Sequence, residues 1–132
     1  LDPGHMTEWS WLLFAAKTGD EALSQDLLST ALRIGRAPDD PRFLVDEVSP
    51  EGEVLSHGRR LWLQAELIKA SLATGDLNRA EQTAAALFDT YLTETPRGTW
   101  RDRFDLNGNM IAETIPASSC YHLWTAVAPL CD

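Results

Sequence analysis

Residues 61–76 read LWLQAELIKASLATGD, and this stretch is the most informative about the fold. Its apolar residues predict a helix from Leu61 to Thr74, because they recur at helical spacing. Gly75 ends that helix, and Asp76 is a good cap for a following helix that extends to about Leu92. The stretch therefore predicts two helices joined by a tight turn.

The same pattern occurs near the start of the chain, where residues 9–20 read WSWLLFAAKTGD. Apolar residues recur at three- and four-residue intervals from Glu8 to Lys17, and Gly19 ends the run. Asp20 then caps a helix that extends to about Ile34. The two Thr-Gly-Asp junctions are 56 residues apart, so the helical hairpin is repeated.

The 56-residue interval extends over the whole chain. Added to the first helix start near Met6 it gives Trp62, and added again it gives Ser118, from which a third apolar helical stretch runs to Leu130. We therefore predict an all-α single domain over residues 1–132, with about two and a half copies of an αα-hairpin unit. Such repeats suggest a toroid, in which one helix of each pair lines the inside and its partner covers the outside.

Two long loops separate the hairpins. Residues 38–57 contain a Pro50-Glu51-Gly52 turn and residues 98–115 contain an Asn107-Gly108-Asn109 turn, so each loop predicts a short β-hairpin. Both loops lead into the N-terminal ends of the predicted inner helices. Those ends would gather on one face, which is a natural place for a site.

The composition excludes several classes of function. A formal net charge of −9 disfavours nucleic acid and anionic membranes as partners. The longest apolar run is far short of the roughly 20 residues of a membrane span. Cys120 and Cys131 form no CxxC pair, so a reducing cytoplasm is the expected compartment.

Gly4-His5-Met6 could be a tag-cleavage scar, but Leu1-Asp2-Pro3 precedes it, and we expect the chain to begin inside a larger protein.

His5 and Glu8 are the first candidates for chemistry. At an i, i+3 spacing they can share one helix face, where the carboxylate would orient the imidazole as a general acid or base. A solvated helix start, in which Glu8 interacts with the helix dipole, explains the pair at least as well.

Trp62 and Glu66 are i, i+4 neighbours on the next inner helix, and Lys69 follows them. A tryptophan beside a carboxylate suits a sugar, because the ring stacks on C–H faces and the carboxylate accepts hydroxyl hydrogen bonds. The alternative is a core tryptophan with a Glu66–Lys69 pair on the surface.

His122 lies one turn into the third inner helix and, taken alone, has the character of a core histidine. Cys120 stands two residues before it, so the two side chains do not face each other and a thiol-protease pair is excluded; Cys120 is expected to pack. His5, Glu8 and His122 have suitable atoms for zinc or iron. However, no two histidines share a metal-binding spacing, so no metal is expected.

Three segments together resemble the C-terminal part of the acylglucosamine-2-epimerase superfamily of sugar epimerases and aldose–ketose isomerases. They are residues 4–13 (GHMTEWSWLL), residues 60–70 (RLWLQAELIKA) and residues 115–122 (IPASSCYH). The resemblance covers nearly the whole chain but only about the last third of a typical member. Leu63 stands where many members have proline, and this difference bears on fine specificity.

The resemblance implies an (α/α)6 barrel and a mechanism that uses neither a metal nor a cofactor. The family's two histidines correspond to His5 and His122, which handle ring opening and proton transfer at C1 and C2 through an enediol. We expect His122 to be the base at C2 and His5 to open the ring and return the proton. Glu8 would support His5, and the sugar pocket would be lined by Glu8, Arg60, Trp62 and Glu66.

Within the family, the middle and last motifs favour the mannose or mannose-6-phosphate isomerase branch. A 2-epimerase of the N-acylglucosamine or cellobiose type is the alternative. A phosphate would need a cation, for which Arg59, Arg97, Arg101 and Arg103 are candidates, although surface charge explains each of them. A hypothesis from a different functional class is that the chain is a non-catalytic helical-repeat fragment. Such a fragment would act by forming a homodimer or by pairing with a partner N-terminal half.

Overall fold

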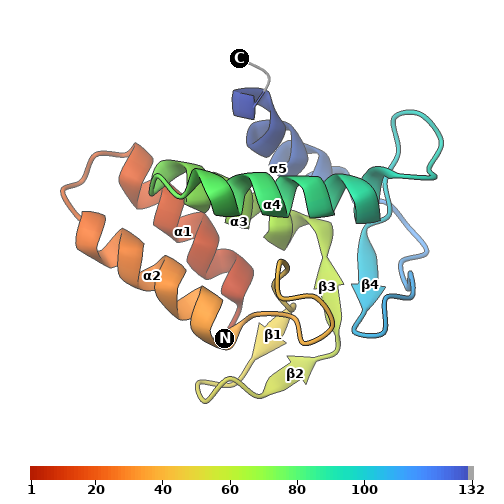
Figure 1. Ribbon diagram of the computed structural model, residues 1–132, viewed down its shortest axis with the longest axis horizontal. Helices are drawn as coiled ribbons and strands as arrows, with labels where there is room; N and C mark the ends of the chain where they lie inside the picture. Colours follow the sequence, from red (N-terminus) through yellow and green to blue (C-terminus); the bar gives the residue numbers. More distant parts are fainter. Residues whose placement is uncertain (131–132) are drawn as a thin grey trace.

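The computed structural model describes residues 1–130, and helices dominate it (Figure 1). The α-helices are α1 (Pro3–Ala15), α2 (Glu21–Ile34), α3 (Leu61–Ala73), α4 (Leu77–Leu87) and α5 (Ala117–Val127). A π-helical turn (Phe88–Leu92) continues α4, and a 3-10 turn (Ala128–Leu130) continues α5.

The predicted helices are confirmed, and their ends lie close to the expected residues. Gly19 and Gly75 have φ angles of +82° and +81°, a left-handed conformation that residues with a Cβ rarely adopt. Asp76 caps α4, since its side chain accepts a hydrogen bond from the backbone N–H of Arg79. Asp20 precedes α2 as predicted, but its side chain makes no cap hydrogen bond.

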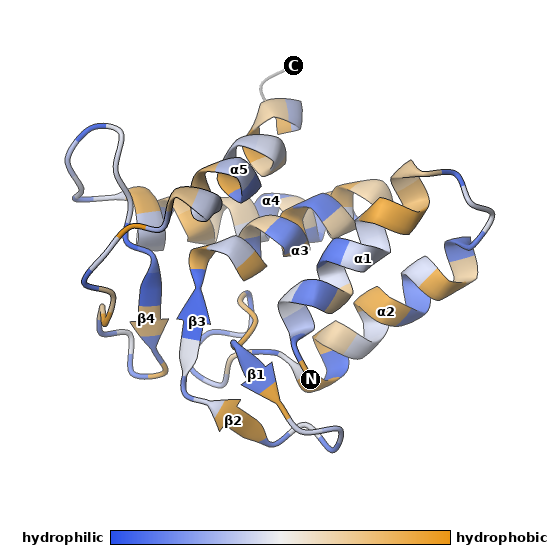
Figure 2. Ribbon diagram, turned by 180° about the vertical axis from the view of Figure 1, so that it is seen from behind, coloured by the Kyte–Doolittle hydropathy of each residue, from blue (hydrophilic) through white to orange (hydrophobic). Residues whose placement is uncertain are grey.

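Helix α3 lies at the centre of the helical layer. It packs against α1 and α5, while α2 packs against α1 and α4 packs against α3 (Figure 1). Every residue from Leu63 to Ser71 is buried. Helix α2, by contrast, carries both hydrophobic and hydrophilic residues along its length (Figure 2), as expected of a helix that covers a core on one side. Thus α1, α3 and α5 form the inner row and α2 and α4 form the cover, as the repeat predicted.

The first long loop forms the predicted hairpin. Strand β1 (Glu47–Val48) pairs antiparallel with β2 (Val54–Ser56). Gly52 supplies a φ of +92° in the turn between them. This conformation explains why the turn carries a glycine.

The second long loop forms a pairing that the sequence did not predict. Strand β4 (Arg103–Asp105) pairs antiparallel with β3 (Gly58–Arg60), the strand that leads directly into α3. The expected local hairpin also forms, as a short one: the Asp105 amide donates to the Asn109 carbonyl at 2.9 Å, the Ile111 amide donates to the Arg103 carbonyl at 3.0 Å, and Phe104 and Met110 form an isolated bridge. The pairing with β3 was not predicted, because turn chemistry alone does not reveal a partner so distant in sequence.

The N-terminal ends of all three inner helices are held on the side where the strands lie (Figure 1). Before α1, the carbonyl of Leu1 accepts a hydrogen bond from the backbone amide of Val48 at 2.9 Å. The first amide of α3, on Leu61, donates to the carbonyl of Asp102 at 2.8 Å. The same aspartate accepts a hydrogen bond from the hydroxyl of Ser119 in α5 at 2.6 Å. The loops therefore fix the relative positions of the helix starts.

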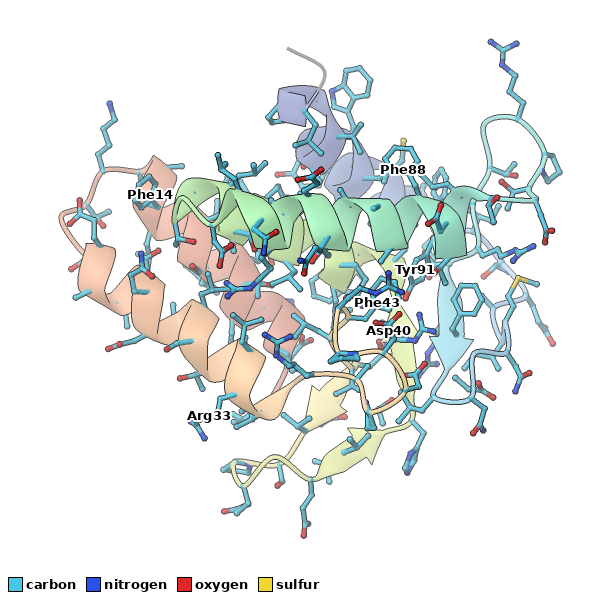
Figure 3. The ribbon with its side chains drawn as sticks, in the orientation of Figure 1. Phe14, Arg33, Asp40, Phe43, Phe88 and Tyr91 are labelled. Atoms are coloured by element: carbon cyan, nitrogen blue, oxygen red, sulfur yellow. The ribbon has the colours of Figure 1, made fainter. Side chains whose placement is uncertain are left out.

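An aromatic cluster fills the core beneath α4, where Phe43 and Tyr91 lie together (Figure 3). The Tyr91 ring meets Phe43 edge-on at a centroid distance of 5.5 Å and Phe104 at 5.0 Å. The Arg59 guanidinium lies 4.6 Å above the Phe43 ring and 3.0 Å from the carboxylate of Asp39. Burial raises the pKa of the Tyr91 phenol, because the charged form would lose its hydration.

Two further expectations concern the cysteines and membranes. Cys120 was expected to pack, but its side chain is exposed, so that prediction is wrong: it lies on a face of α5 that α3 does not cover. Cys131 lies outside the described residues.

None of the helices within residues 1–130 has the length and apolar character needed to cross a membrane.

Candidate active site

Trp62, at the start of α3, lies between the two histidines singled out in the sequence. Its ring centroid is 5.1 Å from that of His5 in α1 and 5.3 Å from that of His122 in α5. Residues from three successive inner helices therefore meet at the end where the strands lie. The face of the indole is an apolar surface of the kind against which a sugar ring stacks.

Glu66 is the centre of a buried polar cluster, one turn further along α3. One carboxylate oxygen, Oε1, is 2.5 Å from His122 Nδ1 and 2.5 Å from Lys69 Nζ. The other, Oε2, accepts a hydrogen bond from the indole N–H of Trp11 at 2.5 Å. The side chain is fully buried. Glu66 was expected to line the sugar pocket, but here it contacts protein groups, because three neighbouring helices close over it.

The repeat explains why these residues meet. Glu66 and His122 are separated by 56 residues, and so are Lys69 and Thr125, whose side chains form a hydrogen bond of 3.1 Å. Helices α3 and α5 begin one repeat apart and pack side by side, so a residue meets its counterpart 56 positions later. Trp11 and Lys69 were not assigned to the site from the sequence. The 56-residue interval pairs Lys69 with Thr125, but it does not pair Trp11 with Glu66, which are 55 residues apart.

The Glu66 contact defines the orientation of the His122 imidazole. An ionised carboxylate accepts hydrogen bonds and has no proton to donate, so the ring nitrogen that faces it must carry the hydrogen. Nδ1 is therefore the N–H, and in the neutral ring Nε2 carries the lone pair. The side chain is 17% exposed, so the ring is held in place yet reaches the surface. A buried carboxylate behind an imidazole is the arrangement of a positioned general base.

His5 has a different environment. Its Nδ1 lies 2.8 Å from the carboxylate of Asp2, and its side chain is 60% exposed. Glu8 was expected to support this imidazole, but Asp2 is the carboxylate in contact with it. The reason is that side chains in a helix lean toward its N-terminus, so His5 reaches back to the N-cap residue. Glu8 instead lies on the side of Glu66 and His122.

Glu8, Glu66 and His122 place one ligand atom each within 4.8 Å of one another, a spacing that would suit a metal ion. The chemistry of this donor set does not fit one. The Lys69 ammonium already occupies Glu66 Oε1, and the Trp11 indole occupies Oε2. A metal would have to displace a cation 2.5 Å away from the same oxygen, so the cluster functions as an internal ion pair.

Arg60 belongs to a neighbouring cluster. Its guanidinium Nε lies 3.4 Å from Asp46, which also accepts from the Arg60 backbone amide at 2.8 Å. The side chain borders a small cavity of about 260 Å³ together with Asp2, which contacts His5. Arg60, which was expected to line the sugar pocket, is therefore paired with Asp46 at the edge of this cavity.

Three of the four arginines considered for phosphate have carboxylate partners. Arg59 contacts Asp39, Arg101 contacts Glu94 at 3.1 Å, and Arg103 contacts Asp46 at 2.9 Å. Arg97 is exposed in the loop before β4. The remaining charged groups near the histidines are mainly acidic, which gives the site little attraction for an anion.

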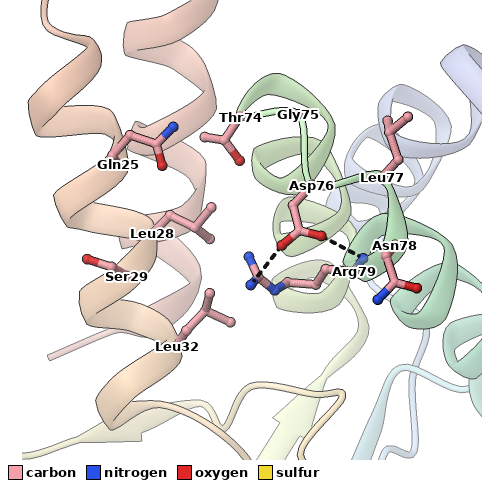
Figure 4. Close-up of a pocket in the computed structure, with 10 residues that line it drawn as sticks. All are labelled: Gln25, Leu28, Ser29, Leu32, Thr74, Gly75, Asp76, Leu77, Asn78 and Arg79. Carbon is pink, nitrogen blue, oxygen red and sulfur yellow. Dashed lines mark hydrogen bonds and ion pairs between the residues drawn. The ribbon is translucent and has the colours of Figure 1, made fainter.

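A larger cavity, of about 670 Å³, lies elsewhere (Figure 4). It is a groove between α2 and the turn that joins α3 to α4. Its ionised groups, Asp76 and Arg79, form an ion pair at 2.9 Å and cap α4. The lining belongs to cover helices and turns, so we place the chemistry at the two histidines.

The close packing of α1 on Trp62 leads to a prediction. Replacing Gly4 by alanine is expected to destabilise the protein by about 1–3 kcal/mol. The added Cβ would lie 2.5 Å from Leu63 Cγ and 2.8 Å from Trp62 Cη2, so both side chains must move. Urea unfolding followed by circular dichroism measures the change. Alanine by itself favours a helix over glycine by about 1 kcal/mol, so a variant more stable than the parent would contradict this packing.

Comparisons with known proteins identify the family and the fold of the chain. The family model for N-acylglucosamine 2-epimerase (GlcNAc 2-epimerase) matches residues 1–126. A mannose-6-phosphate isomerase of Rhizobium meliloti (strain 1021) is 30% identical over 146 residues, which cover 100% of this chain and 38% of the relative. A crystal structure of D-mannose isomerase superposes with a TM-score of 0.78 at 22% identity, over 99% of this chain and 37% of that one. The fold is thus that of part of an (α/α)6 barrel, and the chain spans little more than a third of the length of these proteins.

Proposed function

The chain belongs to the N-acylglucosamine 2-epimerase family, and from this membership we propose that it supplies two acid–base groups of a sugar isomerase that interconverts an aldose and a ketose. The relatives named for mannose and mannose 6-phosphate isomerisation support this choice. The single observation that carries it is the buried Glu66–His122 contact beside the Trp62 ring.

In the proposed reaction His122 is the base. Its Nε2 lone pair removes the proton from C2 of the open-chain aldose, and the electron pair passes to the carbonyl to give an enediolate, which becomes an enediol when O1 takes up a proton. Return of a proton to C1, with loss of the proton from O2, yields the ketose. Return to C2 from the opposite face would yield the epimer, which is how the same groups would serve a 2-epimerase. Glu66 acts as a positioning residue, because it touches His122 and not solvent.

His5 and Trp62 act on the other side of the substrate. The exposed His5 imidazole, which Asp2 orients, is placed to move a proton during ring opening and to reprotonate the intermediate. The Trp62 ring between the two histidines gives a surface for the C–H face of the sugar. Neither role requires a metal or a cofactor.

We further propose a neutral sugar, of the mannose and fructose type, as the substrate. Arg59, Arg101 and Arg103 each contact a carboxylate, and the chain carries a net charge of −9. A dianionic phosphate would therefore find little compensating charge on this part of the site. An enzyme specific for the 6-phosphate would need cations from outside these residues.

Hydrogen exchange tests the proposal and the choice of substrate together. The complete gene product is incubated in heavy water with mannose and, separately, with mannose 6-phosphate, and NMR follows deuterium at C2 and the appearance of ketose or epimer. We expect exchange and fructose from mannose and at least tenfold slower exchange from the phosphate. Faster reaction of the phosphate would reverse the substrate assignment. Epimer without ketose would identify a 2-epimerase instead.

A non-catalytic helical module is the alternative of another class. The inner-row helices at both edges expose large apolar side chains, among them Trp9 on α1 and Trp124 on α5. These faces suit a second copy or a partner half that completes the ring of helices. A protein that forms such a complex in solution yet exchanges no C2 hydrogen would support this reading. We expect either form to act in the cytoplasm.

A further inference from the structure

Lys69 has no part in the proposed reaction, yet it lies at the centre of the site. Its side chain is 6% exposed, and its ammonium lies 2.5 Å from Glu66 Oε1 and 3.1 Å from the hydroxyl of Thr125. The same ammonium lies 4.5 Å from the ring centroid of Trp11 and 5.4 Å from that of Tyr121. Two aromatic faces and two oxygens therefore surround one buried cation.

The position of this cation matters because it shares an oxygen with the catalytic imidazole. Glu66 Oε1 is in contact with both Lys69 Nζ and His122 Nδ1. The carboxylate and the ammonium together carry no net charge. A neutral ion pair favours a second proton on a neighbouring imidazole much less than a lone buried carboxylate does.

We propose that Lys69 is a positioning residue that keeps His122 available as a base by neutralising Glu66. The inference rests on the proposed function insofar as His122 is the base. An imidazolium has no lone pair and cannot accept the C2 proton. Lys69 would thus allow Glu66 to orient the ring through Nδ1 without protonating Nε2.

The other charged and titratable groups that the structure describes around His122 include no permanent cation that could neutralise Glu66 in place of Lys69. From α1, Glu8 contributes a second carboxylate near the ring, and His5 faces it across Trp62. From α3 come Glu66 and Lys69 themselves. Tyr121, next to His122 on α5, contributes a neutral phenol whose ring is 5.2 Å away. Among these described groups, Lys69 is the permanent cation nearest to the carboxylates.

The test measures the protonation of His122 directly and does not depend on turnover. The complete gene product is labelled with ¹⁵N-histidine, the His122 signals are assigned by their absence in His122→Gln, and their pH midpoint is followed by NMR. Lys69→Met is expected to raise this midpoint by about 1–3 pH units, the effect of one opposite charge on a neighbouring group. Lys69→Arg keeps the charge and is the matched control, with a midpoint within about 0.5 unit of the parent's.

A second pair of variants separates charge from packing. Glu66→Gln leaves the ammonium alone and is expected to lower the midpoint, and adding Lys69→Met to it is expected to raise the midpoint again. This double variant has no buried charge to balance, so it is expected to fold even where Lys69→Met does not. Equal midpoints in the parent and Lys69→Met, or in Glu66→Gln and the double variant, would overturn the proposal.

Kinetics distinguish this inference from the proposed function. Where the gene product isomerises sugar, the acid limb of its pH–rate profile is expected to move with the NMR midpoint in Lys69→Met, so that raising the pH restores rate. Midpoints that shift as predicted in a protein without sugar activity would refute the proposed function and leave the charge relation intact. Activity with unmoved midpoints would refute the role of Lys69 alone.

Discussion

Replacing His122 by alanine is expected to reduce C2 hydrogen exchange by about 10²–10⁴-fold, the usual contribution of a positioned general base. The variant removes the nitrogen that takes the proton and leaves Trp62 and His5 in place. Loss of rate should therefore exceed any loss of sugar affinity. Deuterium incorporation at C2, measured by NMR at saturating sugar, gives the ratio.

The matched control for this experiment is His57→Ala. His57 lies exposed between β2 and β3, outside the cluster around Glu66, and its removal is expected to leave the exchange rate unchanged. Intact exchange in His122→Ala would refute the assignment of the base. A drop of equal size in both variants would indicate that the loss reflects a general effect of the substitutions instead.

Replacing Tyr91 by alanine is expected to lower the free energy of unfolding by about 3–5 kcal/mol, as for other large aromatic side chains in cores. Tyr91 is fully buried between Phe43 and Phe104, and its hydroxyl donates to the carbonyl of Arg59 at 3.1 Å. Since small domains are stable by only about 5–15 kcal/mol, the variant should be partly unfolded at 37 °C. Urea unfolding at 25 °C measures the difference.

Phe88→Ala is the matched control, because Phe88 begins the same π-helical turn but is 46% exposed (Figure 3). Its expected cost is below about 1 kcal/mol. Equal destabilisation by the two variants would contradict the central position of Tyr91 in the core.

The pH dependence of the free energy of unfolding provides a second test of the buried position of Tyr91. Burial raises the pKa of its phenol above the value in the unfolded chain. The neutral form therefore contributes stability below about pH 10, and that contribution is lost as the pH rises further. Tyr91→Phe should remove this part of the alkaline destabilisation.

The helical architecture could be predicted from the sequence because its signals are local. The spacing of apolar residues around Leu61 and the glycine at position 75 act within a few residues of where they stand, and both Thr-Gly-Asp junctions form the expected turns. The 56-residue interval also indicated which helices occupy equivalent positions in the repeat. It therefore predicted the inner row of helices and the meeting of His5, Trp62 and His122 at one end of that row.

Local sequence signals thus predicted the helices, their order and the meeting of His5, Trp62 and His122, but not the contacts of Trp11 and Lys69 with Glu66. The tertiary structure alone decided the partner of each charged group: Asp2 rather than Glu8 for His5, and a shared Glu66 oxygen for Lys69 and His122. It also decided that β4 pairs with β3. The physical reason is that periodicity describes the face on which a side chain lies, whereas an ion pair or a strand ladder depends on distances of a few ångströms between segments far apart in the chain, which are set when the helices pack.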